Sequence, residues 1–354
     1  MLALSIHADY ACRHSGRCCG TAWDVPAEAE ARTAIEAGIA AGRLPMLDAF
    51  EAGTPPAGYA GVLRKGADGA CVWLDRETRL CTVHARLGAA VLPVTCRQFP
   101  RIARTGPRGV AITLSHYCPT AARLLLREDV PLTVVEHPAA FPAGAYEGLE
   151  ADEWPPLLAG RVLMDDDAFE AWEALLVSRC AAAPTMWTAL TAMRQDAAAL
   201  AAWRPGEAAL TDVVRHRTGG AMEAVAPPEA AWIRSRAEDA RGVSPGARPF
   251  VGPTAPDAAL GALAAFDRPA RRFLAGHAFA SWCAYQGRGI ATQVRGVETA
   301  AAVLVLETAR ALHGARDFGE DAFLEAVAAT DFLLRHQASR EDLAALWSRR
   351  EGLA

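Results

Sequence analysis

The stretch CRHSGRCC at residues 12–19 opens a run of seven cysteines in the first third of this 354-residue chain. The run continues through LPVTCRQFPR at residues 92–101 and ends at a Cys-Pro pair. Its spacing is C-x5-C-C, C-x9-C and then C-x14-C, and its members are Cys12, Cys18, Cys19, Cys71, Cys81, Cys96 and Cys118. So dense a set of thiols in one segment indicates a common physical cause.

Three causes compete: disulfides, a metal or iron–sulfur centre, and chance. Disulfides need an oxidising compartment and are typical of small secreted domains. The first nine residues have no basic region and only a short apolar stretch, so they do not read as an export signal, and we expect a cytoplasmic protein with reduced thiols. Chance packing does not readily produce the adjacent Cys18-Cys19 pair. Metal ligation is therefore favoured, because thiolates bind zinc and iron–sulfur clusters.

The composition is that of a protein with a sizeable core, with 52% hydrophobic and 22% charged residues. The net charge of -5 argues against binding to nucleic acid or to an anionic membrane. No run approaches the roughly 20 apolar residues of a membrane span. Lys65 is the only lysine, and this bias toward arginine, with abundant alanine, is typical of GC-rich bacterial genomes.

Residues 1–128 are predicted to form a cysteine-cluster domain of short, irregular elements. A helix is expected over residues 27–41, behind Pro26. Residues 71–75 and 80–84 read as two short strands around a polar turn, a hairpin that would bring Cys71 close to Cys81. A strand over 109–115 and a helix from Pro119 follow, which places Cys118 at a helix N-terminus, where the dipole favours a thiolate.

The rest of the chain is predicted to be a Pro-rich linker over 129–160 and a helical domain over 161–354. A Pro/Gly-rich loop is expected at about 219–256, and Ser339 with Asp342 forms a capping box. Helices are expected at about 167–180, 185–203, 207–217, 257–266, 269–285, 297–313, 320–336 and 341–349. The fold class is thus mainly α, with a small irregular α+β cysteine-cluster domain followed by a helical domain.

Close C-x2-C pairs of simple zinc modules are absent, so the seven cysteines, all candidate ligands, come from separate elements. They exceed one four-ligand site. They fit one zinc or 4Fe–4S centre with spare thiols, or two centres completed by His14, His84 or His116. At least four sulfurs should converge on one centre. Arg97 and Arg101 are the candidate cofactor-contacting residues, because an arginine beside thiolates can donate to sulfur or offset its charge.

The segments LCTVH (80–84), LPVTCRQFPR (92–101) and LSHYCPTAARLL (114–125), together with the Cys18-Cys19 pair, resemble the bacterial flagellin lysine-N-methylase (FliB-type) family. That family lies within the zinc- or iron-chelating (YkgJ-like) cysteine-cluster proteins, and the resemblance covers about residues 10–127. It implies an iron–sulfur cluster, S-adenosylmethionine as methyl donor and a protein substrate such as flagellin. A lysine methylase also needs a base, for which Asp24 and Asp75 are candidates.

The residues themselves supply no donor site, since neither a G-x-G-x-G loop after a strand nor the C-x3-C-x2-C spacing is present. Lysine methylation therefore rests on the resemblance alone. Three functions stay open: an S-adenosylmethionine-dependent protein-lysine methyltransferase, a non-enzymatic zinc- or iron-binding interaction module, and a redox or metal-delivery protein. Outside the cluster, Cys180 and Cys283 read as small buried hydrophobes and the Asp165–Asp167 run as a helix cap.

Overall fold

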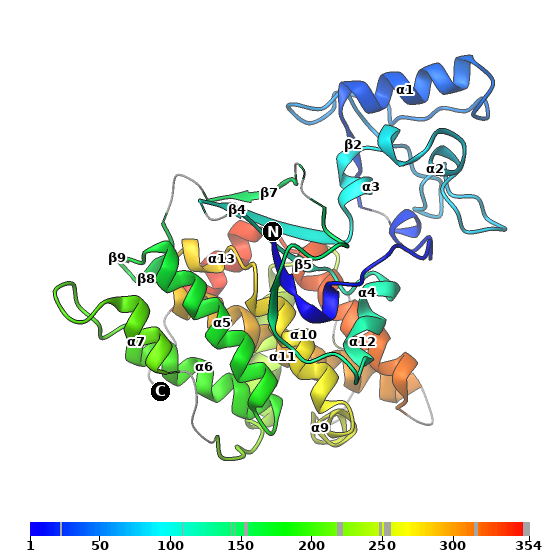
Figure 1. Cartoon of the computed structure of the whole chain (residues 1–354). Coiled ribbons are helices and arrows are strands. Elements are labelled where there is room, and N and C mark those ends of the chain that lie inside the picture. The colour runs from blue at the N-terminus through cyan, green and yellow to red at the C-terminus, as the bar shows by residue number, and fades with distance from the viewer. Residues whose placement is uncertain are drawn as a thin grey trace. The chain divides into compact units, whose positions relative to one another are not determined.

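The computed structural model describes residues 1–21, 23–107, 109–142, 144, 146–151, 155–217, 222–247, 250, 256–314 and 318–349. The chain divides into two compact units. The first, here called the cysteine unit, consists of Ala11–Arg101 and Cys118–Thr120. The second, the helical unit, consists of Met1–Tyr10, Ile102–Tyr117 and Ala121–Ala354. Both can be followed by colour in Figure 1.

The described part of the chain is mainly helical, as predicted. Its α-helices are α1 Ala29–Ala40, α2 Thr82–Leu87, α3 Val94–Gln98, α4 Pro119–Arg123, α5 Asp166–Ala182, α6 Met186–Leu200, α7 Leu210–His216, α8 Ala230–Gly242, α9 Pro256–Ala264, α10 Asp267–Ala278, α11 Ile290–Gly314, α12 Glu320–Asp331 and α13 Arg340–Ser348. A π-helical turn, Phe332–Gln337, continues α12.

Strands are short and fall into three small sheets. The largest has the order β6-β1-β5-β4-β7, with β1 parallel to β5 and antiparallel to β6, and β4 parallel to β7. The strands are β1 Leu2–Leu4, β2 Pro26–Ala27, β3 Gly61–Val62, β4 Arg101–Gly106, β5 Gly109–Leu114, β6 Val134–Glu136, β7 Gly148–Glu150, β8 Leu157–Ala159 and β9 Val162–Leu163. The antiparallel pairs β2–β3 and β8–β9 form the two smaller sheets.

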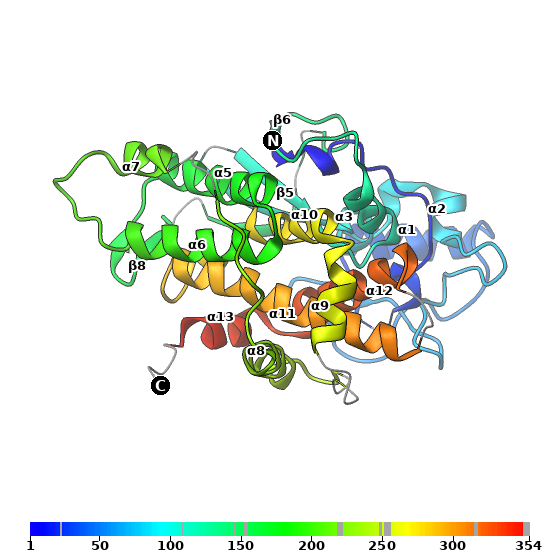
Figure 2. The ribbon, with the colours of Figure 1, turned by 90° about the horizontal axis from the view of Figure 1, so that it is seen from below.

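The helical unit is built around one large apolar core, to which every helix from α5 to α13 contributes buried side chains. Helix α11 is its centre and packs against α6, α8, α9, α10, α12 and α13 (Figure 2). The run from Ala300 to Leu306 is buried all round, which fits a helix with neighbours on every side. Trp172 on α5 is fully buried, and its indole N–H donates to Gln293 Oε1 at 2.9 Å.

The cysteine unit has a much smaller core. It consists of nine buried side chains, with Cys19, Cys81 and Cys96 packed at its edge among other half-buried residues. The nine are Val25, Ile35, Leu44, Ala49, Leu63, Cys71, Trp73, Val83 and Leu92. Much of the rest is loop, so cross-links other than apolar packing matter more for this unit than for the helical one.

The helices expected from apolar periodicity and caps are present, most of them with ends shifted by a few residues. Two differ more: the helix expected over 269–285 ends as α10 at Ala278, and the helix expected over 297–313 begins as α11 at Ile290. Asp165 and Ser339 cap α5 and α13, accepting from Ala168 N at 2.8 Å and Asp342 N at 3.0 Å. The strand predicted over 80–84 is wrong, because Thr82–Leu87 is helix α2. Only an isolated bridge between Leu74 and Cys81 remains of the hairpin.

Two further predicted stretches contain regular structure. Helix α8 lies within 219–256, where a loop was expected, although residues 219–221, 248–249 and 251–255 of that stretch lie outside the described part of the chain. Strands β6, β7 and β8 lie within the Pro-rich stretch 129–160. The prolines do not prevent this, because each strand is only three residues long. Strands β6 and β7 lie between prolines, and β8 follows Pro156.

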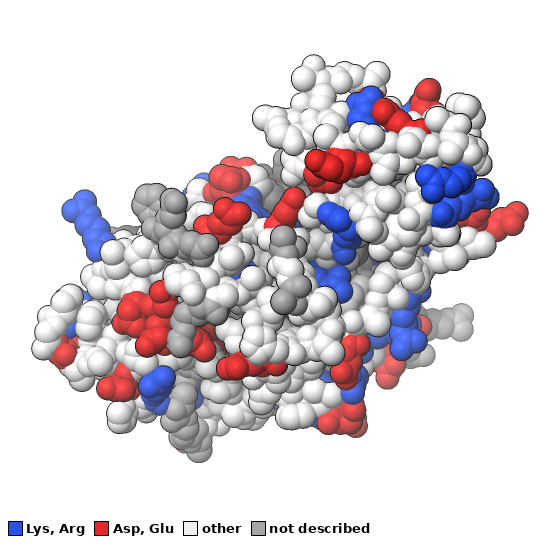
Figure 3. All heavy atoms as spheres, turned by 45° about the horizontal axis from the view of Figure 1, so that its top comes forward, with Lys and Arg blue, Asp and Glu red and all other residues white. Residues whose placement is uncertain are grey.

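The surface carries charge of both signs. On the face shown in Figure 3, basic and acidic side chains are scattered among uncharged residues.

None of the helices in the described ranges combines the length and apolar character that a membrane crossing requires.

Candidate metal centre

The loop that carries Cys18 and Cys19 lies against the turn before Cys81, and a glycine makes this possible. Gly16 has φ +69°, and a Cβ there would lie 2.5 Å from the carbonyl oxygen of Arg79. Only glycine fits both the backbone angle and the space. A hydrogen bond of 2.7 Å from Cys71 N to Cys19 O adds a second tie. Residues distant in sequence are thereby brought together.

The turn itself is held by Asp75. Its Oδ1 accepts from the backbone N–H of Thr78 at 2.7 Å and from the Thr78 hydroxyl at 2.8 Å. Behind the turn, Thr82 N donates to Trp73 O at 2.8 Å. The chain therefore returns toward Cys71 before α2 starts, with Cys81 as its N-cap residue. The predicted proximity of Cys71 and Cys81 thus arises from a turn and a helix start.

Cys96 is positioned by α3 and by an acidic residue from another segment. The carboxylate of Glu28 accepts from Val94 N, the first N–H of α3, at 3.2 Å. A negative charge there satisfies a free helix N–H and complements the helix dipole. Sequence reasoning missed Glu28, because nothing in the local pattern pairs it with a helix 66 residues away.

Three sulfurs form the middle of the cluster. Cys18 Sγ and Cys19 Sγ are 3.9 Å apart, and the Cys19 thiol also hydrogen-bonds to Cys81. Hydrogen bonding with the Cys19 thiol is the largest cause that lowers the pKa of Cys18 to about 7 and that of Cys81 to about 7. The same hydrogen bonds raise the pKa of Cys19. Two of the three sulfurs are therefore easily deprotonated, the state in which a thiol binds metal.

Cys71 and Cys96 lie deeper. Burial is the main cause that raises the pKa of each thiol. The neighbouring Cys71, Cys81 and Cys18 raise the pKa of Cys96 further, whereas the charge of Lys65 acts in the opposite direction. Cys18 and Cys81 each act on the pKa of several of the other thiols, and we call Cys18, Cys19, Cys71, Cys81 and Cys96 the five-thiol cluster.

The chemistry of this donor set fits a tetrahedral thiolate-bound ion. Zinc–sulfur bonds of about 2.3 Å place two sulfurs about 3.8 Å apart across a tetrahedral ion, close to the 3.9 Å between Cys18 and Cys19. Full convergence of four sulfurs, expected from sequence, is not seen. Among the described residues, no three His, Cys, Asp or Glu side chains are placed so that they could hold one metal ion. Binding would therefore draw the sulfurs together.

The other predicted ligands are placed differently. Cys12 is exposed, and its Sγ lies 4.0 Å from Nδ1 of His14. The His14 ring lies 5.1 Å from that of His84 on α2, so Cys12, His14 and His84 lie close together. The backbone N–H of His84 also bonds to the Cys81 thiol. Cys118 is buried at the start of α4, as predicted. His116 belongs to the helical unit.

Arg97 and Asp75, two of the polar residues predicted to assist at the site, are bonded to other parts of the chain. Arg97 is exposed and donates to the carbonyl of Ala90 at 3.2 Å. Arg101 is half-buried at the start of β4. Asp24 is exposed. Asp75 is engaged in its turn, and the N–H of Thr78 lowers its pKa, which makes it a poor base near neutral pH.

The helical unit contains a buried polar network that sequence reasoning missed. Asp331 lies at its centre, accepting from His277 Nε2 at 2.7 Å and from Arg335 Nε at 3.1 Å, and its carboxylate also accepts from the backbone N–H of His116. His7 and His116 approach to 3.2 Å between their Nε2 atoms. These residues come from four distant segments. No local pattern could have grouped them, and the π-helical turn that brings Arg335 to Asp331 has no sequence signature.

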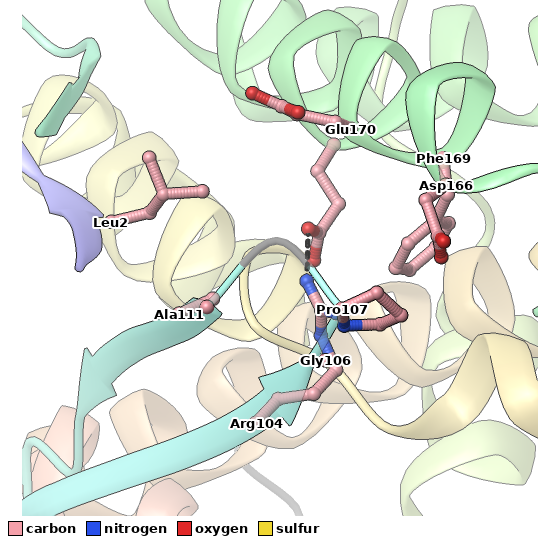
Figure 4. Close-up of a pocket in the computed structure, with 10 residues that line it drawn as sticks. Leu2, Arg104, Gly106, Pro107, Ala111, Asp166, Phe169 and Glu170 are labelled. Carbon is pink, nitrogen blue, oxygen red and sulfur yellow. Dashed lines mark hydrogen bonds and ion pairs between the residues drawn. The ribbon is translucent and has the colours of Figure 1, made fainter. Parts of the chain in front are cut away.

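A small pocket also lies in this unit (Figure 4). Arg104 points into it from β4 and pairs with Glu173 at 2.5 Å, while its NH1 donates to Tyr285 Oη at 3.1 Å. Asp166, Phe169 and Glu170 of α5 line the opposite wall, as Figure 4 shows. The guanidinium is already committed to protein partners, so the pocket reads as the edge of a buried ion pair.

Comparison with known proteins identifies only the cysteine-rich part. No curated protein and no solved structure gives a significant match. Residues 11–119 match a family model described as "Putative zinc- or iron-chelating domain". The matched range contains all seven clustered cysteines and nearly all of the cysteine unit. The cysteine-rich first third of this chain is therefore similar to that family of zinc- or iron-chelating domains.

Proposed function

We propose that the cysteine unit binds one zinc or iron ion through thiolates of the five-thiol cluster, and that the ion holds the unit in its folded form. The observation that carries this proposal is the gathering of five sulfurs from separate loops and helix starts around a nine-residue core. A bound ion cross-links these segments at one point. Thiols lose their protons on binding, so metal uptake releases protons and its free energy becomes folding free energy.

A single ion is favoured over an iron–sulfur cluster by the close approach of Cys18 and Cys19. Two sulfurs about 3.8 Å apart fit the edge of one metal tetrahedron. In a cluster, inorganic sulfide fills part of each iron's coordination shell. Sulfide analysis therefore separates the two centres.

The test is anaerobic purification of the full chain followed by metal and acid-labile sulfide analysis. We expect about one zinc or iron per chain and no sulfide. Iron with equimolar sulfide would replace the single-ion centre by the iron–sulfur cluster predicted from sequence. A chain that is metal-free and binds neither added Zn²⁺ nor added Fe²⁺ would overturn the proposal.

The resemblance to flagellin lysine methylases adds a second, enzymatic candidate. It is supported by the LPVTCRQFPR segment and its neighbours, all within the matched domain. No contact in the described residues favours it. Its test is calorimetry with S-adenosylmethionine and transfer of labelled methyl groups to flagellin or another lysine-rich protein. Neither donor binding nor labelling would leave the metal-binding module as the function.

A further inference from the structure

Lys65 faces the five-thiol cluster. It forms an isolated antiparallel bridge with Cys71, so their side chains leave the backbone on the same side. Its backbone N–H donates to Glu51 Oε1 at 2.8 Å, which fixes the segment. It is also the only lysine in the chain, which contains 35 arginines.

The ammonium group of Lys65 is buried among protein atoms. Its Nζ has essentially no exposed surface and no hydrogen-bond partner among the described residues. The neighbouring Arg64, in contrast, is exposed to solvent and forms an ion pair with Asp48 at 2.7 Å. A buried charge without a counter-charge costs several kcal/mol. The position of Lys65 therefore calls for a negative partner within the cysteine unit.

The antiparallel bridge places Lys65 beside Cys71, a member of the five-thiol cluster. Once an ion is bound, four thiolates around a divalent metal carry a net charge of about −2. A buried cation beside them offsets half of that charge. A compact ammonium on a flexible stem fits this place better than a planar guanidinium does.

We propose that Lys65, opposite Cys71, is the charge partner of the metal-bound thiolates of the five-thiol cluster. This inference rests on the proposed metal binding. It makes Lys65 a positioning residue, with no direct contact to the metal. The lysine should weaken the metal-free unit, where its charge is uncompensated, and strengthen the metal-bound one.

The test compares Lys65→Met with Lys65→Arg and with Arg64→Met as the matched control, all in the full chain. Zn²⁺ or Fe²⁺ affinity is measured by competition with a chelator. We expect Lys65→Met to bind 10- to 100-fold more weakly, the size typical of outer-shell partners. Lys65→Arg should recover part of this loss, and Arg64→Met should stay within twofold of the natural chain.

A second readout separates charge pairing from a merely structural role. In the metal-free protein, Lys65→Met should raise the urea midpoint of the cysteine unit, because it removes a buried charge. A structural lysine would instead lower that midpoint and the affinity together. Unchanged affinity in Lys65→Met, or a lowered midpoint without metal, would overturn the inference. A natural chain that binds no metal would end the proposed function itself, a distinguishable outcome.

Discussion

The cysteine unit and the helical unit reach a folded state by different means. The helical unit buries side chains from nine helices in one core, including the fully buried Trp172 and Phe273. The cysteine unit has nine buried core side chains, of which Cys71 is one, and the other four thiols of the five-thiol cluster are half-buried. Apolar burial supplies about 25 cal/mol per Å², so the helical unit has ample driving force of its own. The five-thiol cluster thus lies in the unit whose apolar core is too small to stabilise the fold by itself.

The largest expected effect comes from Cys96→Ala. Losing this half-buried thiol should remove the metal and unfold the cysteine unit, because structural zinc binding is worth on the order of 10 kcal/mol. Cys180→Ala is the control, since its thiol is fully buried in the helical core and its loss should cost only about 1 kcal/mol. Metal content and urea unfolding measure both. Equal metal loss in the two variants would break the division between the units.

The next largest expected effect is a loss of stability confined to the helical unit. Trp172→Ala leaves a cavity in a core position with no exposed surface and should cost about 3–5 kcal/mol. Its indole also donates to Gln293, which would be left without that partner. Urea unfolding should show the loss in the helical transition, while metal affinity stays unchanged. Weakened metal binding would show that the two units are not independent.

The sequence carried enough to predict most of the helices and the presence of a cysteine-cluster domain. Long alanine- and leucine-rich periods and the caps at Asp165 and Ser339 are local signals, and they place α5 and α13 correctly. Helix α8 was not predicted, because its sequence is rich in arginine and acidic residues and lies between Pro/Gly-rich segments. The Thr82–Leu87 error has a similar origin, since six residues carry too little periodicity to separate helix from strand. Glu28 and Asp331 act across long sequence separations, which a local pattern does not contain.

Lowering the pH should reduce the unfolding free energy of the helical unit, because the imidazole of His277 is buried in its neutral form. Burial, and then the charge of Arg335, lowers the pKa of His277 to about 4, against 6.5 in the unfolded chain. Between these values the unfolded state binds more protons, so stability falls as pH drops from 6.5 toward 4. The loss is up to about 3 kcal/mol for this imidazole. Urea unfolding of metal-stripped protein across that range measures it.

His277→Asn should flatten this dependence, and the exposed His137→Asn serves as control. A pH profile that is the same in His277→Asn and the natural chain would contradict the buried, neutral state of His277.

A smaller effect is expected from Gly16→Ala. The left-handed φ and the close Arg79 carbonyl should together cost about 2 kcal/mol in the cysteine unit. Because this loop carries Cys18 and Cys19, metal affinity should fall as well. Gly42→Ala, at a similar φ of +67° with open space around it, isolates the backbone strain. Equal effects in both variants would show that the contact with Arg79 contributes nothing.

The most direct test of the contrast between the units is hydrogen–deuterium exchange of the full chain with metal bound and after chelation. We predict that peptides from residues 23–101 lose protection when metal is removed, while peptides from α5, α6 and α11 keep theirs. Restoring Zn²⁺ or Fe²⁺ should restore the protection. Unchanged exchange in the cysteine unit after complete metal removal, or equal loss of protection in both units, would contradict the account.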